Sequence, residues 1–382
     1  MARPPDDRSA GQGPARRRSP WLSFAILIAV LLLAAASAVG YLVVVYPAER
    51  GTGTGTAAVT IEPTTTLTDV ANQLARERLV LHPWTFALYG RALGAQNKLR
   101  HGRILVMRGM TARELLQRVA VGFGSAAVRI TIPEGWTRYE IATRLAEWGL
   151  CERAAFISVT EDPQLLATID PRAQSAEGFL FPDTYWLSDA LTPRAIADKL
   201  VGNGRKRWAA IAQSDEEGIT RVREELGFGS YEIVTLASIV EKEARVPSEQ
   251  PVIAGVFLNR LRDPKFKPKR LQADPTVAYG CVVQPNLQSC LQFDGRKVTR
   301  VMTADPANPY NTYRFDGLPP GPIGSPGSSA LRAVLAPAAH GFFYFVARGD
   351  GRHAFTSTLE SHGQEVQRAA ATRAQTEPLS NP

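Results

Sequence analysis

The stretch WLSFAILIAVLLLAAASAVGYLVVVY, Trp21–Tyr46, is a run of 26 residues without a charge. A hydrocarbon core about 30 Å thick is spanned by roughly 20 apolar helical residues, so this stretch predicts a transmembrane helix. Arg16, Arg17 and Arg18 directly precede it, and no comparable basic cluster follows. The positive-inside rule places such a cluster in the cytoplasm. We therefore expect a single-pass protein whose long C-terminal part lies outside the cytoplasm.

A cleaved signal peptide is the alternative, because Ala36, Ser37 and Ala38 resemble a small-residue cleavage site. The apolar run before them exceeds the roughly 7–15 apolar residues of a signal peptide, and apolar residues continue after them. The sequence favours an uncleaved anchor.

Composition separates tails and linkers from the folded part. Residues 1–20 are rich in Pro, Arg, Gly and Ser and predict a basic disordered tail, and residues 371–382 predict a second tail. The GTGTGT repeat in residues 47–56 predicts a flexible spacer. The net charge of +8 is modest for 382 residues, and outside the first tail the charges are mixed. No nucleic-acid-binding surface is predicted.

The three cysteines are Cys151, Cys281 and Cys290. Cys281 and Cys290 bracket a short polar segment, and in an oxidising compartment they favour a disulfide that closes a hairpin. A zinc site needs closer ligand spacing. We therefore expect no metal and no cofactor.

Strand and helix patterns alternate in residues 57–125 and predict a small unit of the order strand, helix, helix, strand, helix. The expected elements are a strand at 57–63, a helix capped by Thr66 or Thr68, a helix at 84–93, a strand at 103–107 and a capping-box helix at 111–119. A strand, an IEP or IPEG turn, a threonine and a helix follow one another at Ile61 and again at Ile132, which indicates a loose repeat.

Residues 126–370 predict a larger mixed domain, so that the fold class is α+β. Residues 151–223 are expected to be mainly helical, with an interruption at 177–185. Further helices are expected at 231–245, 252–261 and 331–335, a strand at 342–347, and a loop-rich segment at 271–326.

Several mechanisms are excluded, because the chain has no G-x-S-x-G, S-x-x-K, H-E-x-x-H or Walker motif. The five histidines are scattered; His353 and His362 favour surface or hydrogen-bonded roles over a metal pair. Carboxylates and uncharged polar groups remain.

The helix LASIVEKEAR, Leu236–Arg245, places Glu241 on a largely apolar face. Desolvation there favours the protonated carboxyl, which a general acid needs at neutral pH. An i,i+4 ion pair of Glu241 with Arg245 is an equal alternative. Glu243 is expected to be solvated.

Two polar segments, residues 271–280 and 308–327, join amides, hydroxyls, aromatics and an arginine on a Pro- and Gly-rich frame. This composition suits a sugar-binding groove, and an ordinary turn-rich surface loop is the alternative. The length of the loop-rich segment favours function.

A series of motifs resembles the endolytic murein transglycosylases of the MltG type, the YceG-like family, from the anchor to about Gln367. They are IPEGWTRYEIA, EGFLFPDTYW, LASIVEKEA, VFLNRL, LQADPTVAYG, PYNTYRFDGLPPGPIGSPG, YFVA and HAFTSTLESH. The resemblance implies an inner-membrane lyase with a LysM-like subdomain (57–125) and a catalytic domain (126–370) in the periplasm. It implies cleavage of the MurNAc–GlcNAc β-1,4 bond of nascent peptidoglycan, 1,6-anhydroMurNAc ends and penicillin-binding synthases as partners.

Carried over by motif position, the resemblance makes Glu241 the catalytic acid/base. The substrate-binding residues that it implies are Gln272, Asp274, Thr276, Asn311, Tyr313 and Arg314. The chain departs from the family pattern in the basic stretch RDPKFKPKR, residues 262–270, and in an enlarged loop over 280–308. A non-catalytic peptidoglycan-binding scaffold and a muramidase-type hydrolase are the alternative functions.

Overall fold

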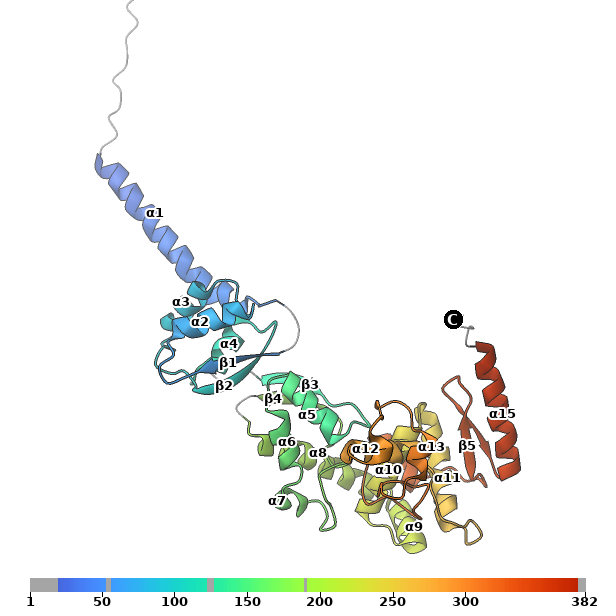
Figure 1. Cartoon of the computed structure of the whole chain (residues 1–382). Coiled ribbons are helices and arrows are strands. Elements are labelled where there is room, and N and C mark those ends of the chain that lie inside the picture. The colour runs from blue at the N-terminus through green and yellow to red at the C-terminus, as the bar shows by residue number, and fades with distance from the viewer. Residues whose placement is uncertain (1–19, 53–55, 122–126, 189–190, 377–382) are drawn as a thin grey trace, which may run out of the picture. The chain divides into compact units, whose positions relative to one another are not determined.

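A computed structural model describes residues 20–52, 56–121, 127–188 and 191–376 (Figure 1). The chain forms two compact units. The first consists of Met1–Ile104 and Arg108–Gly124, and the second of Leu105–Met107 and Ser125–Pro382. The predicted basic tail up to residue 19, the middle of the GTGTGT repeat and the last six residues lie outside the described residues.

The apolar N-terminal stretch is helical. Helix α1 (Pro20–Gly40) continues as a π-helical turn, η1 (Tyr41–Val45), and a 3-10 turn, η2 (Tyr46–Ala48). Among the described residues, Phe24–Ala48 is the one helix long and apolar enough to cross a membrane, with a mean hydropathy of 2.6 over its most apolar stretch, none of which is buried.

The predicted spacer is wrong in its first part, because its backbone is bonded to the unit that follows. The Glu49 carbonyl accepts a hydrogen bond from the Ala112 N–H (2.9 Å), and the Gly51 N–H donates to Met110 O (3.3 Å). The apolar helix therefore runs into the first unit without a flexible joint.

The first unit has the predicted order of strands and helices. It consists of β1 (Thr56–Ile61), α2 (Leu67–Arg76), α3 (Pro83–Ala92), the first three residues of β2 (Gly102–Met107) and α4 (Ala112–Val119), and β1 pairs with β2. Thr66 caps α2 and Thr111 caps α4, each in a capping box with the acidic residue three positions on. These reciprocal bonds satisfy the first backbone N–H groups of each helix and fix where it begins.

The second unit begins with a strand–helix pair like that of the first. Strand β3 (Ala127–Thr131) leads to α5 (Arg138–Glu147), which Thr137 caps in a box with Glu140. Strand β3 pairs antiparallel with β4 (Thr184–Ser188). Between and after them lie α6 (Arg153–Val159), α7 (Pro163–Leu166), α8 (Pro193–Ser214) and α9 (Glu216–Leu226). Ile130, Ile141, Leu187 and Leu200 meet in one core cluster.

Helix α10 (Ser230–Glu243) is the central helix of the second unit, with nearly every residue up to Val240 buried. It packs against α11 (Gln250–Arg262) and α14 (Ser328–Leu335), and a short turn, η3 (Pro247–Glu249), connects α10 to α11. A helix that is apolar on all sides has to be enclosed. The buried part of the helix therefore fixes the position of its carboxyl end.

The segment 271–326 is more ordered than its composition predicts. Residues Asp274–Val283 form α12, with Pro275 in its first turn, where a missing N–H costs nothing. A short turn, η4 (Gln288–Cys290), and α13 (Arg300–Ala304) follow, and Cys281 and Cys290 form a disulfide. The predicted pairing is thus confirmed, while Cys151 is a free, half-buried thiol.

The chain ends in an antiparallel pair, β5 (Tyr344–Ala347) with β6 (His353–Thr356), and helix α15 (Leu359–Thr376). The prediction of a tail from residue 371 is wrong as far as Thr376, because α15 continues to that residue.

Candidate active site

Glu241 lies at the carboxyl end of α10, half-buried, and its Oε2 accepts a hydrogen bond from the Gly327 N–H at 3.0 Å. Gly327 is the N-cap residue of α14. The alternative ion pair with Arg245 is not formed among the described residues, because α10 ends at Glu243 and Ala244 is already extended.

Two glycine-containing segments hold this carboxylate between them. The Gly135 N–H donates to Ser325 O at 2.7 Å, and the Ser325 N–H donates to Trp136 O at 2.8 Å. Gly135 has a φ of +75°, and a methyl group on it would lie 3.5 Å from Glu241 Cγ. A methyl group on Gly324 would lie 2.6 Å from Gly135 O, so this close approach of two backbones requires glycine. The carboxylate is positioned by backbone rather than by mobile side chains.

Opposing influences act on the pKa of Glu241. Burial raises it most, the Gly327 N–H lowers it, the Glu134 carboxylate raises it and Lys242 lowers it, with an upward result. Glu134 lies against the same glycine, since a methyl group on Gly327 would be 1.9 Å from Glu134 Oε1. A carboxyl with a raised pKa that still has a donor for its ionised form is suited both to give and to accept a proton.

A cavity of about 550 Å³ opens beside this corner, between α5 and α12. Glu241 is not one of its lining residues, but its neighbour Lys242 and the residue after Gly135, Trp136, are. The Arg144 guanidinium lies 4.8 Å from the Trp136 ring centre. The other aromatic and cationic lining residues are Tyr139, Arg153, Tyr279 and Phe293.

Glu177 is a fully buried carboxylate that holds the two walls of this cavity together. Its oxygens accept from the Arg138 backbone N–H at 3.1 Å, and its Oε2 accepts from the Tyr279 hydroxyl at 2.9 Å. Arg138 begins α5 and Tyr279 belongs to α12. Burial raises the pKa of Glu177 to about 7, against the lowering by these hydrogen bonds.

Four of the six predicted binding residues reach the surface, at a place other than this cavity. Gln272, Asp274 and Arg314 are exposed, and Tyr313 is half-buried and donates to Asp274 Oδ1 at 2.7 Å. Gln272 has a φ of +53°, an uncommon conformation for a side-chain-bearing residue, and its N–H donates to Thr312 O. Their contact with substrate stays a prediction.

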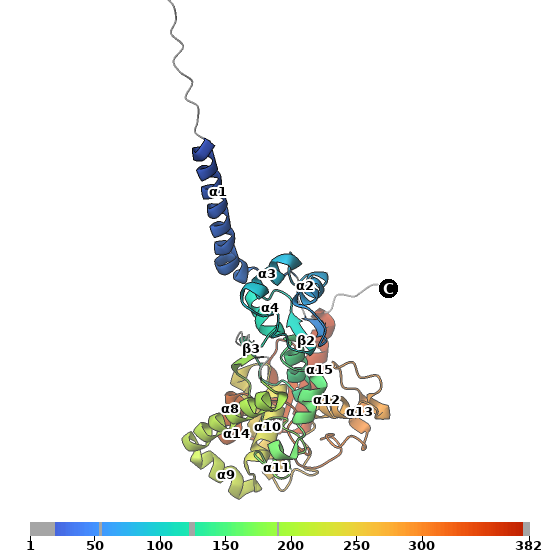
Figure 2. The same cartoon turned by 90° about the vertical axis from the view of Figure 1, so that its left-hand side faces the viewer.

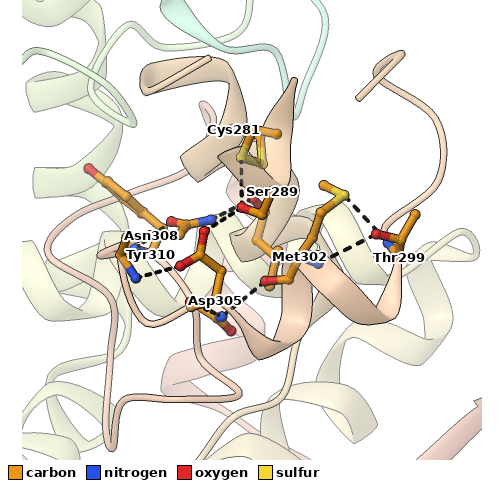
Figure 3. Close-up of a disulfide and its surroundings, with 11 residues drawn as sticks. Cys281, Ser289, Thr299, Met302, Asp305, Asn308 and Tyr310 are labelled. Atoms are coloured by element: carbon orange, nitrogen blue, oxygen red, sulfur yellow. Dashed lines mark hydrogen bonds between the residues drawn. A yellow bond between two sulfur atoms is a disulfide. The ribbon is translucent and has the colours of Figure 1, made fainter. Parts of the chain in front are cut away.

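The other two, Thr276 and Asn311, are fully buried, so their prediction as groove-lining residues is wrong. The Asn311 amide donates to the carbonyls of Met302, Thr303 and Asp305 at 3.2, 3.1 and 2.7 Å. The Thr276 hydroxyl bonds Ala273 O and the Thr312 hydroxyl. These bonds fix the loop that follows the disulfide. Figure 3 shows this disulfide and, in the same region, the Ser289 hydroxyl that donates to Asp305.

The prediction of a solvated Glu243 is also wrong. It is half-buried, and burial together with the nearby Asp274 charge raises its pKa to about 8, while Arg260 opposes this. The charge of Asp274 acts on it from a distant part of the sequence, which the helix pattern alone could not indicate.

No group of His, Cys, Asp and Glu within the described residues could hold a metal ion. His353 Nδ1 instead pairs with Glu249 Oε2 at 2.7 Å, with both side chains largely buried. Sequence reasoning assigned no role to Glu134 and Glu177, although both lie in motifs that carried the family resemblance, IPEGWT and EGFLFPDTY.

Comparison with known proteins tests the resemblance. The endolytic murein transglycosylase of Bacillus subtilis (strain 168) is 25% identical, over 86% of this chain and 88% of the relative. Endolytic murein transglycosylases of Streptococcus pneumoniae are 26% identical over 78% of this chain, which spans 55% of their length. These names agree with the predicted enzyme class.

A solved structure is similar as well. The crystal structure of a YceG-like protein from Listeria monocytogenes superposes with a TM-score of 0.51 at 26% identity, over 82% of this chain and 99% of that one. The profile of the YceG-like family matches residues 59–368, most of the chain. The predicted family is therefore confirmed: this chain belongs to the YceG-like family.

Proposed function

We propose that the chain is a lytic transglycosylase that cleaves the MurNAc–GlcNAc β-1,4 bond within peptidoglycan glycan strands and leaves 1,6-anhydroMurNAc ends. The observation that carries the proposal is the half-buried Glu241 carboxyl with a raised pKa, bonded to the Gly327 N–H beside a groove. The names of the curated relatives support the reaction and the substrate.

Glu241 acts twice in the proposed mechanism. Its protonated carboxyl donates to the glycosidic oxygen as the bond breaks with oxocarbenium character. The carboxylate that results is stabilised by the Gly327 N–H and Lys242, and it then accepts the proton of the C6 hydroxyl. That hydroxyl attacks the anomeric carbon and closes the anhydro ring. Ordinary glycosidases need a second carboxylate to supply or activate a nucleophile; here the nucleophile belongs to the substrate.

The surroundings of Glu241 suit a glycan. Trp136 and Tyr139 offer ring faces to sugar rings, and Arg144 and Lys242 offer donors to hydroxyl, acetamido and lactyl groups. The Glu134 carboxylate beside Gly327 is placed to stabilise the positive charge that develops on the sugar. The exposed set of Gln272, Asp274, Tyr313 and Arg314 is proposed to bind the strand outside the cavity.

The proposal includes where the reaction takes place. Phe24–Ala48 is proposed to anchor the chain in the inner membrane with the N-terminus in the cytoplasm, so that the catalytic unit lies in the periplasm. The first unit is proposed to be LysM-like. An anchored enzyme is confined to the surface where strands emerge, which raises its effective concentration there. Penicillin-binding synthases are the proposed partners, and termination of strand elongation is the proposed outcome.

The test uses the full chain in detergent, wild type and Glu241→Gln, with purified uncrosslinked glycan strands. Mass spectrometry of the products distinguishes anhydro ends from water-added reducing ends. We expect anhydro ends with the wild type and none with Glu241→Gln. Water-added ends would establish a muramidase instead. Intact strands with the wild type, together with equal strand binding by both proteins, would establish a scaffold.

A further inference from the structure

Helix α3 exposes large apolar side chains on the face that points away from the core of the first unit. Phe86 and Ala87 are buried in the core of the first unit. On its outer side Trp84 and Leu88, four residues apart, are 67% and 41% exposed, and Leu81, two residues before the helix, is 65% exposed. A helix at a water-covered surface carries polar residues on its outer side, whereas one that is apolar all round is covered by something else.

Helix α3 adjoins the end of the apolar N-terminal helix (Figure 2). Tyr46, which is 3% exposed, lies edge-on to Tyr89 of α3 with ring centres 5.6 Å apart. The hydrogen bond from the Ala112 N–H to Glu49 O fixes the next residues to α4. Because no flexible segment intervenes, α3 stays beside the point where the apolar helix ends.

Between them lies a cavity of about 270 Å³ within the first unit. Leu42, Val43 and Pro47 line it from the apolar stretch, and Leu93 lines it from the residue after α3. Its polar lining residues are Arg113 and Gln117 of α4. An apolar space with one exposed guanidinium at its edge matches the chemistry of a phospholipid, with an acyl chain on one side and a phosphate on the other.

The charges of α3 fit the same ligand. Arg91 is its single charged residue, and it bonds the Thr68 hydroxyl of α2 at 2.7 Å. Repulsion between an acidic side chain of α3 and anionic headgroups is therefore absent. Trp has an apolar ring system and one N–H donor, and it is enriched where hydrocarbon meets water.

We propose that α3 lies in the membrane interface, with Leu81, Trp84 and Leu88 at the boundary of headgroups and acyl chains and Arg113 on a lipid phosphate. The inference rests on the proposed anchor and goes beyond it, because a span alone requires no contact of the first unit with lipid. The first unit then attaches the chain to the membrane a second time, at the leaflet where the apolar helix ends. Helix α3 lies parallel to the membrane surface, as amphipathic interfacial helices do.

The test is collision of a spin label with two reagents in the full chain, reconstituted in vesicles of phosphatidylethanolamine and phosphatidylglycerol. Oxygen concentrates in lipid and a nickel chelate in water. Cys151→Ser removes the free thiol, and the disulfide leaves no other. Labels are placed one at a time through Trp84→Cys, Leu88→Cys, Leu31→Cys and Ala58→Cys. Leu88→Cys keeps Trp84, so that docking is also tested with the indole in place.

Leu31 reports on the proposed span. Ala58 is the matched aqueous control, because on β1 it is exposed while Ala57 and Val59 are buried, and it therefore points away from the core. We expect the ratio of oxygen to nickel collisions at 84 and 88 to be several-fold higher than at 58 and to approach that at 31.

Three other outcomes overturn the inference, and they are distinguishable. If the ratio of oxygen to nickel collisions at positions 84 and 88 equals that at position 58, while the label at position 31 lies in lipid, the anchor is retained and the interfacial location of α3 is refuted. Low collision rates with both reagents at 84 and 88 mean that protein or glycan covers the face. A label at 31 outside lipid refutes the anchor itself and this inference with it.

Discussion

Two polar regions of the second unit, the surroundings of Glu241 and the loop after the disulfide, differ in which groups hold their polar side chains in position. At Glu241, backbone groups of Gly135, Ser325 and Gly327 make the positioning bonds, and the carboxylate is left to titrate. In the loop after the disulfide, side chains make the positioning bonds: Asn308 holds Val277 O and Asn311 holds three carbonyls. A polar residue is available for chemistry where the backbone does the structural work.

The largest effect is expected where two backbones approach each other at the Glu241 corner. In Gly324→Ala the new methyl group would lie 2.6 Å from Gly135 O, which cannot move away as a side chain could. The segments that hold Glu241 must separate, and misplacement by about 1 Å lowers rates about 100-fold. The measurement is the rate of strand cleavage per folded molecule.

Gly341→Ala is the matched control, because no heavy atom lies within 4 Å of its new methyl group. We expect the control to cleave at the wild-type rate. Equal rates for both variants would show that the corner tolerates displacement and that backbone positioning is unimportant for this reaction.

In the loop after the disulfide the effect should fall on stability. Asn311→Ala leaves the carbonyls of Met302, Thr303 and Asp305 without their amide donor in a buried place. Unsatisfied buried groups destabilise by about 1–3 kcal/mol. We expect a lower melting temperature, with cleavage by the folded fraction retained. Asn286→Ala, at an exposed asparagine of the segment closed by the disulfide, should melt like the wild type. Loss of cleavage without loss of stability would return Asn311 to the substrate-binding residues.

The sequence predicts what depends on neighbours along the chain. Thr66, Thr111 and Thr137 begin helices because each has an acidic residue three positions on, and all three capping boxes are formed. Glu241 could be predicted as a candidate acid because the apolar face of its own helix desolvates it. The YceG-like resemblance added the motifs around it.

What failed depends on contacts between distant segments. Glu243 has an exposed position on the pattern of α10, but it is half-buried in the structure, and the charges of the distant Asp274 and Arg260 act on it. Asn311 was predicted to bind sugar because the partners of its amide are three backbone carbonyls. Every residue has a backbone carbonyl, so the sequence does not indicate which ones an amide will bond. Helix α12 was not predicted, because the composition of residues 271–326 favours loops, although the first turn of a helix accepts a proline such as Pro275.

Glu177 should make stability depend on pH. Its pKa is about 7 in the folded chain and 4.5 as a free group, so the folded state binds more protons between these values. The contribution of Glu177 to the free energy of unfolding is therefore fully present below about pH 4.5. It falls as the pH rises to about 7, by at most about 1.4 kcal/mol per pH unit. Glu177→Gln cannot ionise, so its melting temperature should fall less than that of the wild type between pH 5 and pH 7. An identical fall in both proteins would remove Glu177 as the cause.

The smallest expected effect concerns the charged neighbours of Glu241, which shift the pKa of Glu241 in opposite directions. Glu134 raises the pKa of Glu241 and Lys242 lowers it. The alkaline limb of the kcat/KM profile reports loss of the protonated acid. Glu134→Gln should therefore shift this limb to lower pH, and Lys242→Met should shift it to higher pH. Because both residues are exposed, solvent screening keeps the shifts small. Opposite shifts from two neighbours of one carboxyl would identify the titrating group as Glu241, whereas shifts of the same sign would assign the limb to another residue.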